Sequence, residues 1–330
     1  MLRRCYPTRC GYGGQESEGR RSRIRFGAFL PTYWDDYGTS SIRVAIAEAA
    51  RAAESLGYEG VWANDLVVNP AAAQRGTMVG GQVIEPLVTL ASLVHLVPRL
   101  TLGTNVLVLP QRHPILVAKQ AAALHVLSEG RLILGVGIGH RPEEFALLGA
   151  DYARRAATTD EAIEVLRLLW REPVARYHGR VHHLDGVRLT PPPPDGGPPI
   201  WVGGNSPGAV RRAARSGDGW LPMNCDLDAF RSGVAALREL TRGRRCPTIA
   251  HTFCFRIAKP DEPTAVRSTT PWLHARIAGN PDDVGEHLER YRQAGLEYAL
   301  CLFVSEDLDD LLRQQRIFAE QVAPRFTEAG

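Results

Sequence analysis

Four short segments hold the residues whose types and spacing could do chemistry, and each follows an apolar run. They are segments 63–66 (Ala-Asn-Asp-Leu), 103–106 (Gly-Thr-Asn-Val), 135–140 (Gly-Val-Gly-Ile-Gly-His) and 203–208 (Gly-Gly-Asn-Ser-Pro-Gly). Glycines let a backbone come close to a ligand, and amide, carboxyl and imidazole groups can hold a ring edge or move a proton. No metal is expected, because the chain has no His-Glu-x-x-His, His-x-His or paired-carboxylate arrangement.

Asp65 and His140 are the two candidates for acid–base catalysis. Asp65 follows an apolar strand-like run, and His140 ends the glycine-rich segment. An imidazole titrates near neutral pH and suits proton transfer, and a carboxylate can orient a ring or a substrate. Each residue also has a purely structural interpretation: Asp65 could close an Asx turn, and His140 could support the loop. The residues alone leave both interpretations open.

The segment from Gly203 to Gly208 favours a phosphate site. Gly203 and Gly204 precede Asn205 and Ser206, and a helix-like pattern starts at Pro207. Free amides at a helix N-terminus attract anions, and small residues allow the anion to approach. Helix capping by Asn205 or Ser206 is the alternative, although a cap requires no glycine pair.

These segments belong to an alternation of strand-like and helix-like runs. The expected strands cover residues 25–30, 60–63, 100–109, 131–136, 200–202, 219–221, 249–257 and 298–304. The expected helices cover residues 41–56, 86–97, 114–127, 153–170, 207–215, 227–241, 281–294 and 308–322. Eight strands separated by helical crossovers predict parallel pairing.

The pattern predicts an α/β fold, a closed (β/α)₈ TIM barrel, with a doubly wound sheet as the alternative. Residues 177–189 alternate around Gly179 and Gly186, which predicts a small inserted hairpin after the fourth βα unit. We expect residues 1–23 to form a disordered basic extension and residues 24–330 a single barrel domain. Because barrel enzymes carry their active sites on the loops that follow the strands, all four segments should meet at one end.

Composition restricts the class of protein. The formal charge of the 330-residue chain is +3, but the Arg-rich first 25 residues carry more than this, so the remainder is slightly acidic. A nucleic-acid footprint on the folded body is therefore not expected. No apolar run reaches the roughly 20 residues that a membrane span needs. The six cysteines form no CxxC pair and fit a reducing, cytoplasmic location.

With these segments in place, the chain resembles the luciferase-like oxidoreductases, especially the branch described as probable F420-dependent enzymes. The resemblance runs from about residue 24 to residue 326. Its most specific stretches are LILGVGIGHRPEEFALLGADYARR, DEAIEVLRLLWREPVARYHGRVHHLDGVRLTP and PPIWVGGNSPGAVRRAARSGDGWLP. The passages RFGAFLP, AAESLGYEGVWAND and LTLGTNVLVLPQRHPILVAKQ also match.

The resemblance implies a barrel whose mouth holds a tricyclic cofactor, coenzyme F420 or alternatively FMN. It implies a non-proline cis peptide bond between Asn105 and Val106, below the middle ring. The residues expected to contact the cofactor are Asp65, Thr104, Asn105, Val106, Gly137, Gly139, His140, Gly203, Gly204 and Asn205. The phosphate would lie near the last three of these.

Two positions depart from the family pattern. Deazaflavin relatives often carry Asp-His after the second strand, whereas this chain has Asp65 and Leu66. Some relatives carry Glu after the Gly-x-Gly of the fourth strand, and His140 holds that place here. We therefore expect His140 to do acid–base work, or proton transfer to fall to substrate, water or another side chain.

The expected function is hydride transfer between F420 and a small, largely apolar organic substrate. An FMNH₂-dependent monooxygenase using O₂ is the main alternative, and a non-catalytic barrel is a minor one. Trp34, Leu66, His251 and Trp272 are the expected substrate-side residues. A homodimer formed through barrel helices and a separate flavin or F420 reductase are the expected partners.

Overall fold

The barrel is built from eight parallel strands. The computed structural model describes residues 23–34, 42–68, 82–259, 277–305 and 307–327. The strands are β1 (Arg25–Phe29), β3 (Gly60–Ala63), β5 (Thr101–Thr104), β7 (Leu132–Gly137), β10 (Ile200–Gly203), β11 (Gly219–Leu221), β12 (Thr248–Ile257) and β14 (Tyr298–Phe303). They pair in the order β10-β11-β12-β14-β1-β3-β5-β7, and β7 pairs again with β10. The sheet therefore closes, which confirms the predicted TIM barrel and excludes the doubly wound sheet.

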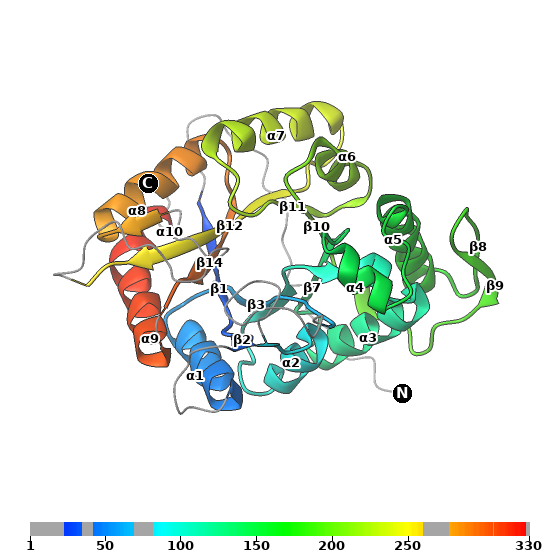
Figure 1. The fold of residues 1–330 in the computed structure, drawn as a ribbon, viewed down its shortest axis with the longest axis horizontal. Coiled ribbons are helices and arrows are strands. Elements are labelled where there is room, and N and C mark those ends of the chain that lie inside the picture. Colours follow the sequence, from blue (N-terminus) through cyan, green and yellow to red (C-terminus); the bar gives the residue numbers. More distant parts are fainter. Residues whose placement is uncertain (1–22, 35–41, 69–81, 260–276, 306, 328–330) are drawn as a thin grey trace, which may run out of the picture.

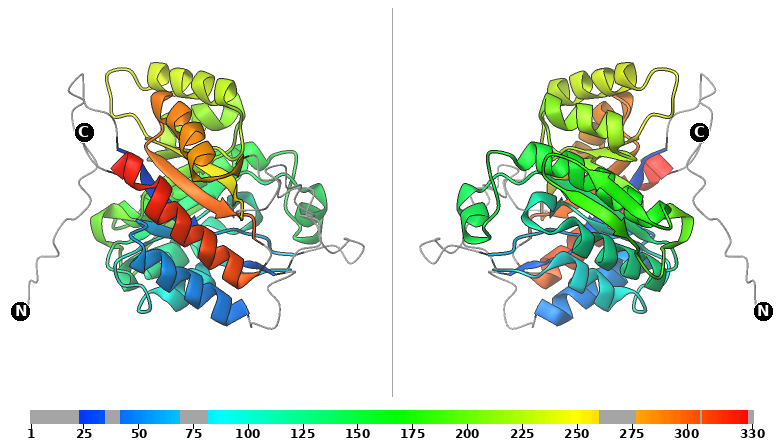
Figure 2. Two further views of the ribbon diagram at one scale, coloured as in Figure 1. Left: turned by 90° about the vertical axis from the view of Figure 1, so that its left-hand side faces the viewer. Right: turned by 90° about the vertical axis from the view of Figure 1, so that its right-hand side faces the viewer.

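Helices surround the strands (Figure 1). The main ones are α1 (Ile42–Ser55), α2 (Pro86–Leu93), α3 (Pro114–Leu127), α5 (Arg155–Arg171), α6 (Pro207–Ser216), α7 (Leu227–Leu240), α8 (Pro281–Gln293) and α9 (Leu308–Ile317). Local sequence sets several starts: Asn280 and Asp283 form a capping box on α8, whose first residue is Pro281. Figure 2 shows α8, α9 and α1 following one another along one side of the barrel.

Several smaller elements interrupt the regular alternation. β8 (Ala175–His178) and β9 (His183–Val187) form the antiparallel hairpin that the sequence predicts, and it projects beyond α5 in Figure 1. Other additions are β2 (Tyr33–Trp34), β4 (Gln82–Val83), β6 (Leu107–Val108), β13 (Ile277–Gly279), α4 (Pro142–Leu147), α10 (Pro324–Thr327) and the single turns η1 (Leu109–Gln111), η2 (Pro194–Gly196) and η3 (Phe318–Val322). The expected extension over residues 1–23 lies almost wholly outside the described residues.

Three predicted elements are wrong in extent. The helix expected over residues 86–97 ends at Leu93. The strand expected over residues 100–109 ends at Thr104, and the chain continues in β6, which pairs with β7 rather than with β3. The helix expected from residue 153 begins at Arg155, and the separate helix α4 precedes it. The errors after β5 and before α5 lie at the C-terminal end of the barrel, where the loops depart from regular geometry.

Three aromatic rings fill the barrel interior. The ring centroid of Trp201 lies 5.2 Å from those of both Trp62 and Tyr298. A Cβ atom on Gly103 would lie 2.3 Å from the Trp62 ring, and one on Gly219 would lie 2.6 Å from the Trp201 ring. Gly103 therefore serves the packing of the interior, since any larger residue would overlap the indole.

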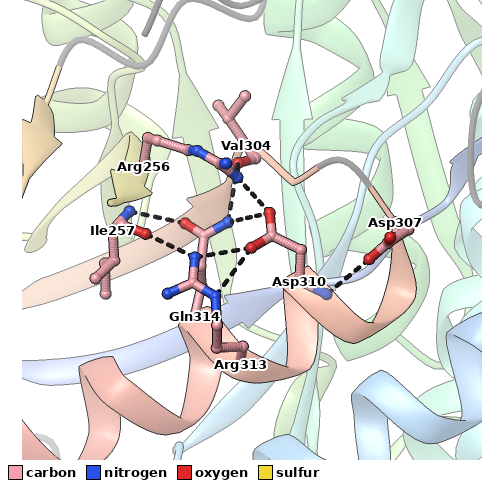
Figure 3. Close-up of polar contacts among 7 residues, drawn as sticks. All are labelled: Arg256, Ile257, Val304, Asp307, Asp310, Arg313 and Gln314. Carbon is pink, nitrogen blue, oxygen red and sulfur yellow. Dashed lines mark hydrogen bonds and ion pairs between the residues drawn. The ribbon is translucent and has the colours of Figure 1, made fainter. Parts of the chain in front are cut away.

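A buried ion-pair network fixes α9 to the ends of β12 and β14 (Figure 3). Arg256 is 2% exposed and pairs with Asp310, which is 5% exposed. Arg256 also donates to the Val304 carbonyl at 3.1 Å, while Arg313 and Gln314 donate to Asp310 at 2.7 and 3.0 Å. Buried charges are tolerated only when they are paired and hydrogen-bonded in this way.

His125 on α3 makes the stability of the fold pH-dependent. Its side chain is buried, and burial lowers its pKa to about 4. In the unfolded chain the imidazole takes up a proton near pH 6.5, so the unfolded state binds more protons between about pH 6.5 and pH 4. The free energy of unfolding therefore has its full value from His125 above about pH 6.5. It falls by about 3 kcal/mol as the pH drops from 6.5 to 4.

Chemical denaturation of the parent and of His125→Leu at a series of pH values measures this effect. The stability of the parent relative to the variant should fall by about 3 kcal/mol between pH 7 and pH 4. The variant is the control for the carboxylates, which titrate equally in both chains. Parallel stability curves would show that His125 is protonated in the folded state as easily as in the unfolded one.

Candidate active site

The loops after β3, β5, β7 and β10 carry the expected functional residues at the C-terminal end of the barrel. The Asn105–Val106 peptide bond is cis, as the resemblance implies. Val106 is partly buried and packs, with Met223, on the apolar cluster that contains Trp62 and Trp201. These two side chains therefore form an apolar floor for the barrel mouth.

Gly137 and Gly203 make room for Val106. A Cβ atom on Gly137 would lie 2.5 Å from one Val106 methyl group, and one on Gly203 would lie 2.7 Å from the other. Real Cβ atoms do not approach so closely, so alanine at either position would displace Val106. The sequence predicts close approach of a ligand at these glycines, and the described structure places the Val106 side chain there.

Asn105 spans the mouth from one wall to the other. Its side-chain amide donates to the Thr252 hydroxyl oxygen at 2.8 Å, and β12, which carries Thr252, lies opposite β5 in the strand order. The Asn105 backbone amide donates to the Ala63 carbonyl at 2.8 Å. Thr104 is fully buried, and its hydroxyl donates to the Gly135 carbonyl at 2.7 Å. The Thr104 side chain thus joins two strands of the wall.

Asp65 forms a two-point ion pair with Arg112. Both guanidinium contacts are 2.7 Å, and the Val108 backbone amide donates to the same carboxylate at 2.8 Å. The Asp65 side chain has no exposed surface, and burial raises its pKa even though Arg112 and the Val108 amide favour the charged form. This carboxylate holds the β3 loop against the β6 segment, an arrangement that favours positioning over contact with a substrate.

Glu144 ties the β7 loop to the β3 loop. It lies in α4, is 3% exposed, and accepts a hydrogen bond from the Val67 backbone amide at 2.8 Å. Leu66 is half-buried between Asp65 and Val67. The side chains of Asp65 and Glu144 therefore hold the segment that surrounds Leu66 from two sides.

His140 is exposed at the end of the same β7 loop. The Tyr152 hydroxyl donates to the His140 carbonyl at 3.4 Å, and Gly139 before it has a φ of +72°. Partial burial of the imidazole, followed by the nearby Arg141 guanidinium, lowers the pKa of His140, and Glu144 opposes the shift. The ring is therefore neutral at pH 7 and able to accept a proton.

Hydrogen bonds hold the loop after β10 against β11 and the residues that follow it. The Gly204 amide donates to the Leu221 carbonyl at 3.3 Å, and the Trp220 indole donates to the Gly204 carbonyl at 3.0 Å. The Asn205 side chain bonds both the amide and the carbonyl of Met223, at 3.0 and 2.8 Å. Gly204 and Asn205 thus hold the loop. Ser206 caps α6, because its hydroxyl accepts a hydrogen bond from the Ala209 amide at 3.2 Å, as the alternative interpretation expects. Pro207 has no amide hydrogen, so an anion at the start of α6 would have to share these amides with the Ser206 cap.

The structure describes the side chains of two of the four expected substrate-side residues, Leu66 and His251. His251 is 1% exposed and contacts Phe230 of α7 and Tyr291 of α8. Along β12, Ala250 and Cys254 belong to the inner cluster, so His251 faces outward and its expected place at the barrel mouth is wrong. The Trp34 side chain and the whole of Trp272 lie outside the described residues.

Sequence reasoning missed Arg112, Glu144 and Thr252. Arg112 and Asp65 are 47 positions apart, and Thr252 and Asn105 are 147 apart, so no local pattern relates them. Glu144 and Val67 are 77 positions apart, so their hydrogen bond is not visible in the sequence either. Among the described residues, no group of three or more His, Cys, Asp and Glu side chains could hold a metal ion. None of the described helices is long and apolar enough to cross a membrane.

Comparison with known proteins identifies the family. Residues 24–276 match the family model for luciferase-like monooxygenases. An uncharacterized protein of Mycobacterium tuberculosis is 35% identical over 217 residues, which cover 62% of this chain and 74% of the relative. The F420-dependent hydroxymycolic acid dehydrogenase of the same species is 32% identical over 236 residues, covering 68% of this chain and 61% of the relative.

Solved structures share the fold. The monooxygenase RslO1 from Streptomyces bottropensis has a TM-score of 0.79 at 21% identity and covers 92% of this chain and 100% of its own. An F420-dependent secondary alcohol dehydrogenase has a TM-score of 0.77 at 18% identity and covers 93% of this chain and 100% of its own. Together with the sequence match, the closed barrel and its glycine-rich mouth show that the chain belongs to the luciferase-like monooxygenase family of oxidoreductases.

Proposed function

We propose that the protein is an F420-dependent oxidoreductase that transfers hydride between the deazaflavin and a small, largely apolar organic substrate. The observation that carries the choice of cofactor is the 32% identity to a relative named as an F420-dependent dehydrogenase. F420 would supply the hydride-accepting or hydride-donating carbon, while the protein supplies placement and electrostatics.

The residues at the mouth suit a flat ring. Val106 and Met223 offer an apolar floor, and the hydrogen bond between Asn105 and Thr252 crosses it. Gly139 and His140 would border the ring from the β7 loop. The start of α6 would hold the phosphate, because helix N-terminal amides favour an anion.

His140 is the residue to which we assign proton transfer. Leu66 has no titratable group, and Asp65 is occupied by Arg112 and Val108. His140 is exposed, neutral at pH 7 and on the loop that Glu144 joins to the segment around Leu66. Leu66 itself adds apolar surface beside the mouth, which suits an organic substrate without charge.

An FMNH₂-dependent monooxygenase using O₂ is the second candidate. Leu66 favours this candidate, because deazaflavin relatives often carry His at that position. The similar structure with the TM-score of 0.79 is described as a monooxygenase. That reaction would require a separate flavin reductase as a partner. A homodimer formed through barrel helices is part of the proposal for either cofactor.

Oxygen uptake separates the two candidates. The purified protein is supplied with FMN, NADH and a flavin reductase, and oxygen consumption is compared with that of the reductase alone over a panel of small ketones, aldehydes and alcohols. The proposal expects no protein-dependent uptake with any of them. Substrate-dependent uptake with formation of an oxygenated product would replace F420 chemistry with the monooxygenase function.

Gly204→Val should weaken the binding of both cofactors and leave the barrel folded. Gly204 has a φ of +120°, which valine rarely adopts, and an added Cβ would lie 3.1 Å from Ala209 at the start of α6. The strain should cost about 1–3 kcal/mol of stability and move the amides that follow. Fluorescence titration with F420 and FMN measures the affinity, and thermal melting confirms the fold.

Gly243→Val is the matched control. Gly243 also has a positive φ, +78°, but it lies in the loop before β12, at the other end of the barrel, and an added Cβ would have no atom within 4 Å. It should lose stability to a similar extent and bind both cofactors as the parent does. Unchanged binding in Gly204→Val would refute the phosphate assignment.

A further inference from the structure

A cavity of about 210 Å³ lies outside the barrel wall, between β12 and the helices α7 and α8. Its lining residues include Cys225, His251, Phe253, His287 and Tyr291. His251 and Phe253 lie on the outward face of β12, so the cavity faces α7 and α8, while Asn224 and Cys254 extend its lining to the barrel wall. It combines aromatic walls with the thiols of Cys225 and Cys254 and two imidazoles, a mixture typical of small-molecule pockets.

The Cys225 thiol and the His251 imidazole are in contact. The Cys225 sulfur lies 3.3 Å from Nε2 of His251. Phe230, Phe253 and Tyr291 surround the His251 ring, with centroids 5.4, 4.2 and 5.1 Å away. The Tyr291 hydroxyl donates to the Cys225 carbonyl at 2.8 Å, so packing holds both partners in place.

Cys225 differs from the other cysteines that the structure describes. Cys254 also lines the cavity, but it has no exposed surface and its sulfur accepts a hydrogen bond from the Asn224 side-chain amide at 3.1 Å. Cys301 has no exposed surface either, and burial raises its pKa well above its usual value. Cys246 is half-buried like Cys225 but is not one of the residues that line the cavity. Reactive thiols are those that are reachable and have a base beside them, and Cys225 meets both conditions.

We propose that this cavity is a second ligand site, which binds small, neutral, apolar disulfides and presents them to Cys225. The aromatic walls favour an apolar ligand, and sulfur packs favourably against aromatic rings. Asp226 at the edge of the cavity disfavours an anionic one. The inference concerns residues that the proposed redox function does not use.

The chemistry is thiol–disulfide exchange. His251 accepts the proton of the Cys225 thiol, and the sulfur attacks one sulfur of the bound disulfide. The disulfide bond of the ligand breaks as the mixed disulfide forms. Cys225 is thereby oxidised, the leaving half is reduced, and it departs as a thiol with the proton that His251 held.

Labelling kinetics of the unmodified protein test the site. The full chain is treated with increasing dithiodipyridine, a neutral aromatic disulfide, and the modification of each cysteine is followed by peptide mass spectrometry. Labelling of Cys225 should be about tenfold or more faster than that of Cys246, and its rate should saturate as the reagent is increased. Cys246 is the internal control, and its rate should rise linearly. A linear rate at Cys225, or one no faster than at Cys246, would overturn the proposal.

His251→Gln separates the role of the imidazole from simple exposure. The variant should slow labelling of Cys225 by about tenfold or more while the rate at Cys246 stays unchanged. Cys225→Ser should remove the fast phase and leave the labelling of Cys246 as it is. Equal rates at Cys225 in the parent and in a folded His251→Gln variant would show that His251 gives the thiol no assistance.

Discussion

Replacing His140 by alanine should lower turnover by about 10²–10⁴-fold, the usual loss when general acid–base help is removed. Cofactor affinity should change much less, because the proposed floor and the phosphate loop lie on other residues. Stopped-flow single turnovers at saturating cofactor, with whichever substrate supports turnover, measure the chemical step. Equilibrium titration of the same variant measures the affinity.

The pH profile gives this prediction a second signature. Partial burial and Arg141 lower the pKa of His140 below its usual value, so the base form predominates at neutral pH. In the direction that needs a base, the rate of the parent should rise as the pH increases through a pKa below about 6.5 and then level off. His140→Ala should lose that inflection together with the rate.

His183→Ala is the control for a generic histidine effect. His183 is exposed and lies in the β8–β9 hairpin, which projects beyond α5 in Figure 1. Its removal should leave the turnover and the pH profile unaltered. An unchanged chemical step in His140→Ala would refute the catalytic assignment and leave the His140 side chain at most a binding role.

Arg112→Ala should destabilise the fold by about 3–5 kcal/mol, the usual cost of leaving a buried charge without its partner. The Asp65 carboxylate has no exposed surface, and Arg112 supplies two of its 2.7 Å contacts. Denaturant unfolding monitored by tryptophan fluorescence measures the loss. The β3 loop should also loosen, so cofactor affinity should fall with the stability.

Arg231→Ala is the matched control for the loss of an ion pair. Arg231 and Asp228 form an exposed pair on α7, with 53% and 93% of their side chains accessible. Such pairs contribute about 0–1 kcal/mol, so this variant should melt close to the parent. A loss below about 1 kcal/mol in Arg112→Ala would mean that Asp65 is neutral or otherwise compensated in the fold.

The fold could be predicted from the sequence because each βα unit carries its own local signals. Strand-like and helix-like apolar runs alternate eight times, and eight such units favour a closed barrel over a doubly wound sheet. The pairing of β7 with β10 shows the closure. The hairpin was likewise predicted from Gly179, which lies in the connection between β8 and β9, whereas Gly186, with a φ of +70°, lies within β9. These features depend on residues close together in the chain.

The site was predictable only in outline. The four loops meet as expected, but the sequence cannot say which atom approaches a glycine, and here Val106 fills the space beside Gly137 and Gly203. Strands buried on both faces lose the alternation of polar and apolar residues, so the outward direction of His251 was not encoded locally. The partners of Asp65 and Asn105 come from distant segments that only the closed barrel brings together.

The most direct test of the central claim is an equilibrium titration of the purified protein with oxidised F420 and, separately, with oxidised FMN, each followed by cofactor fluorescence. The account predicts saturable binding of F420 with a dissociation constant about tenfold or more below that for FMN, a difference of about 1.4 kcal/mol. Gly243→Val should reproduce both values and Gly204→Val should weaken both. Tighter binding of FMN than of F420 would contradict the assignment of a deazaflavin to this barrel.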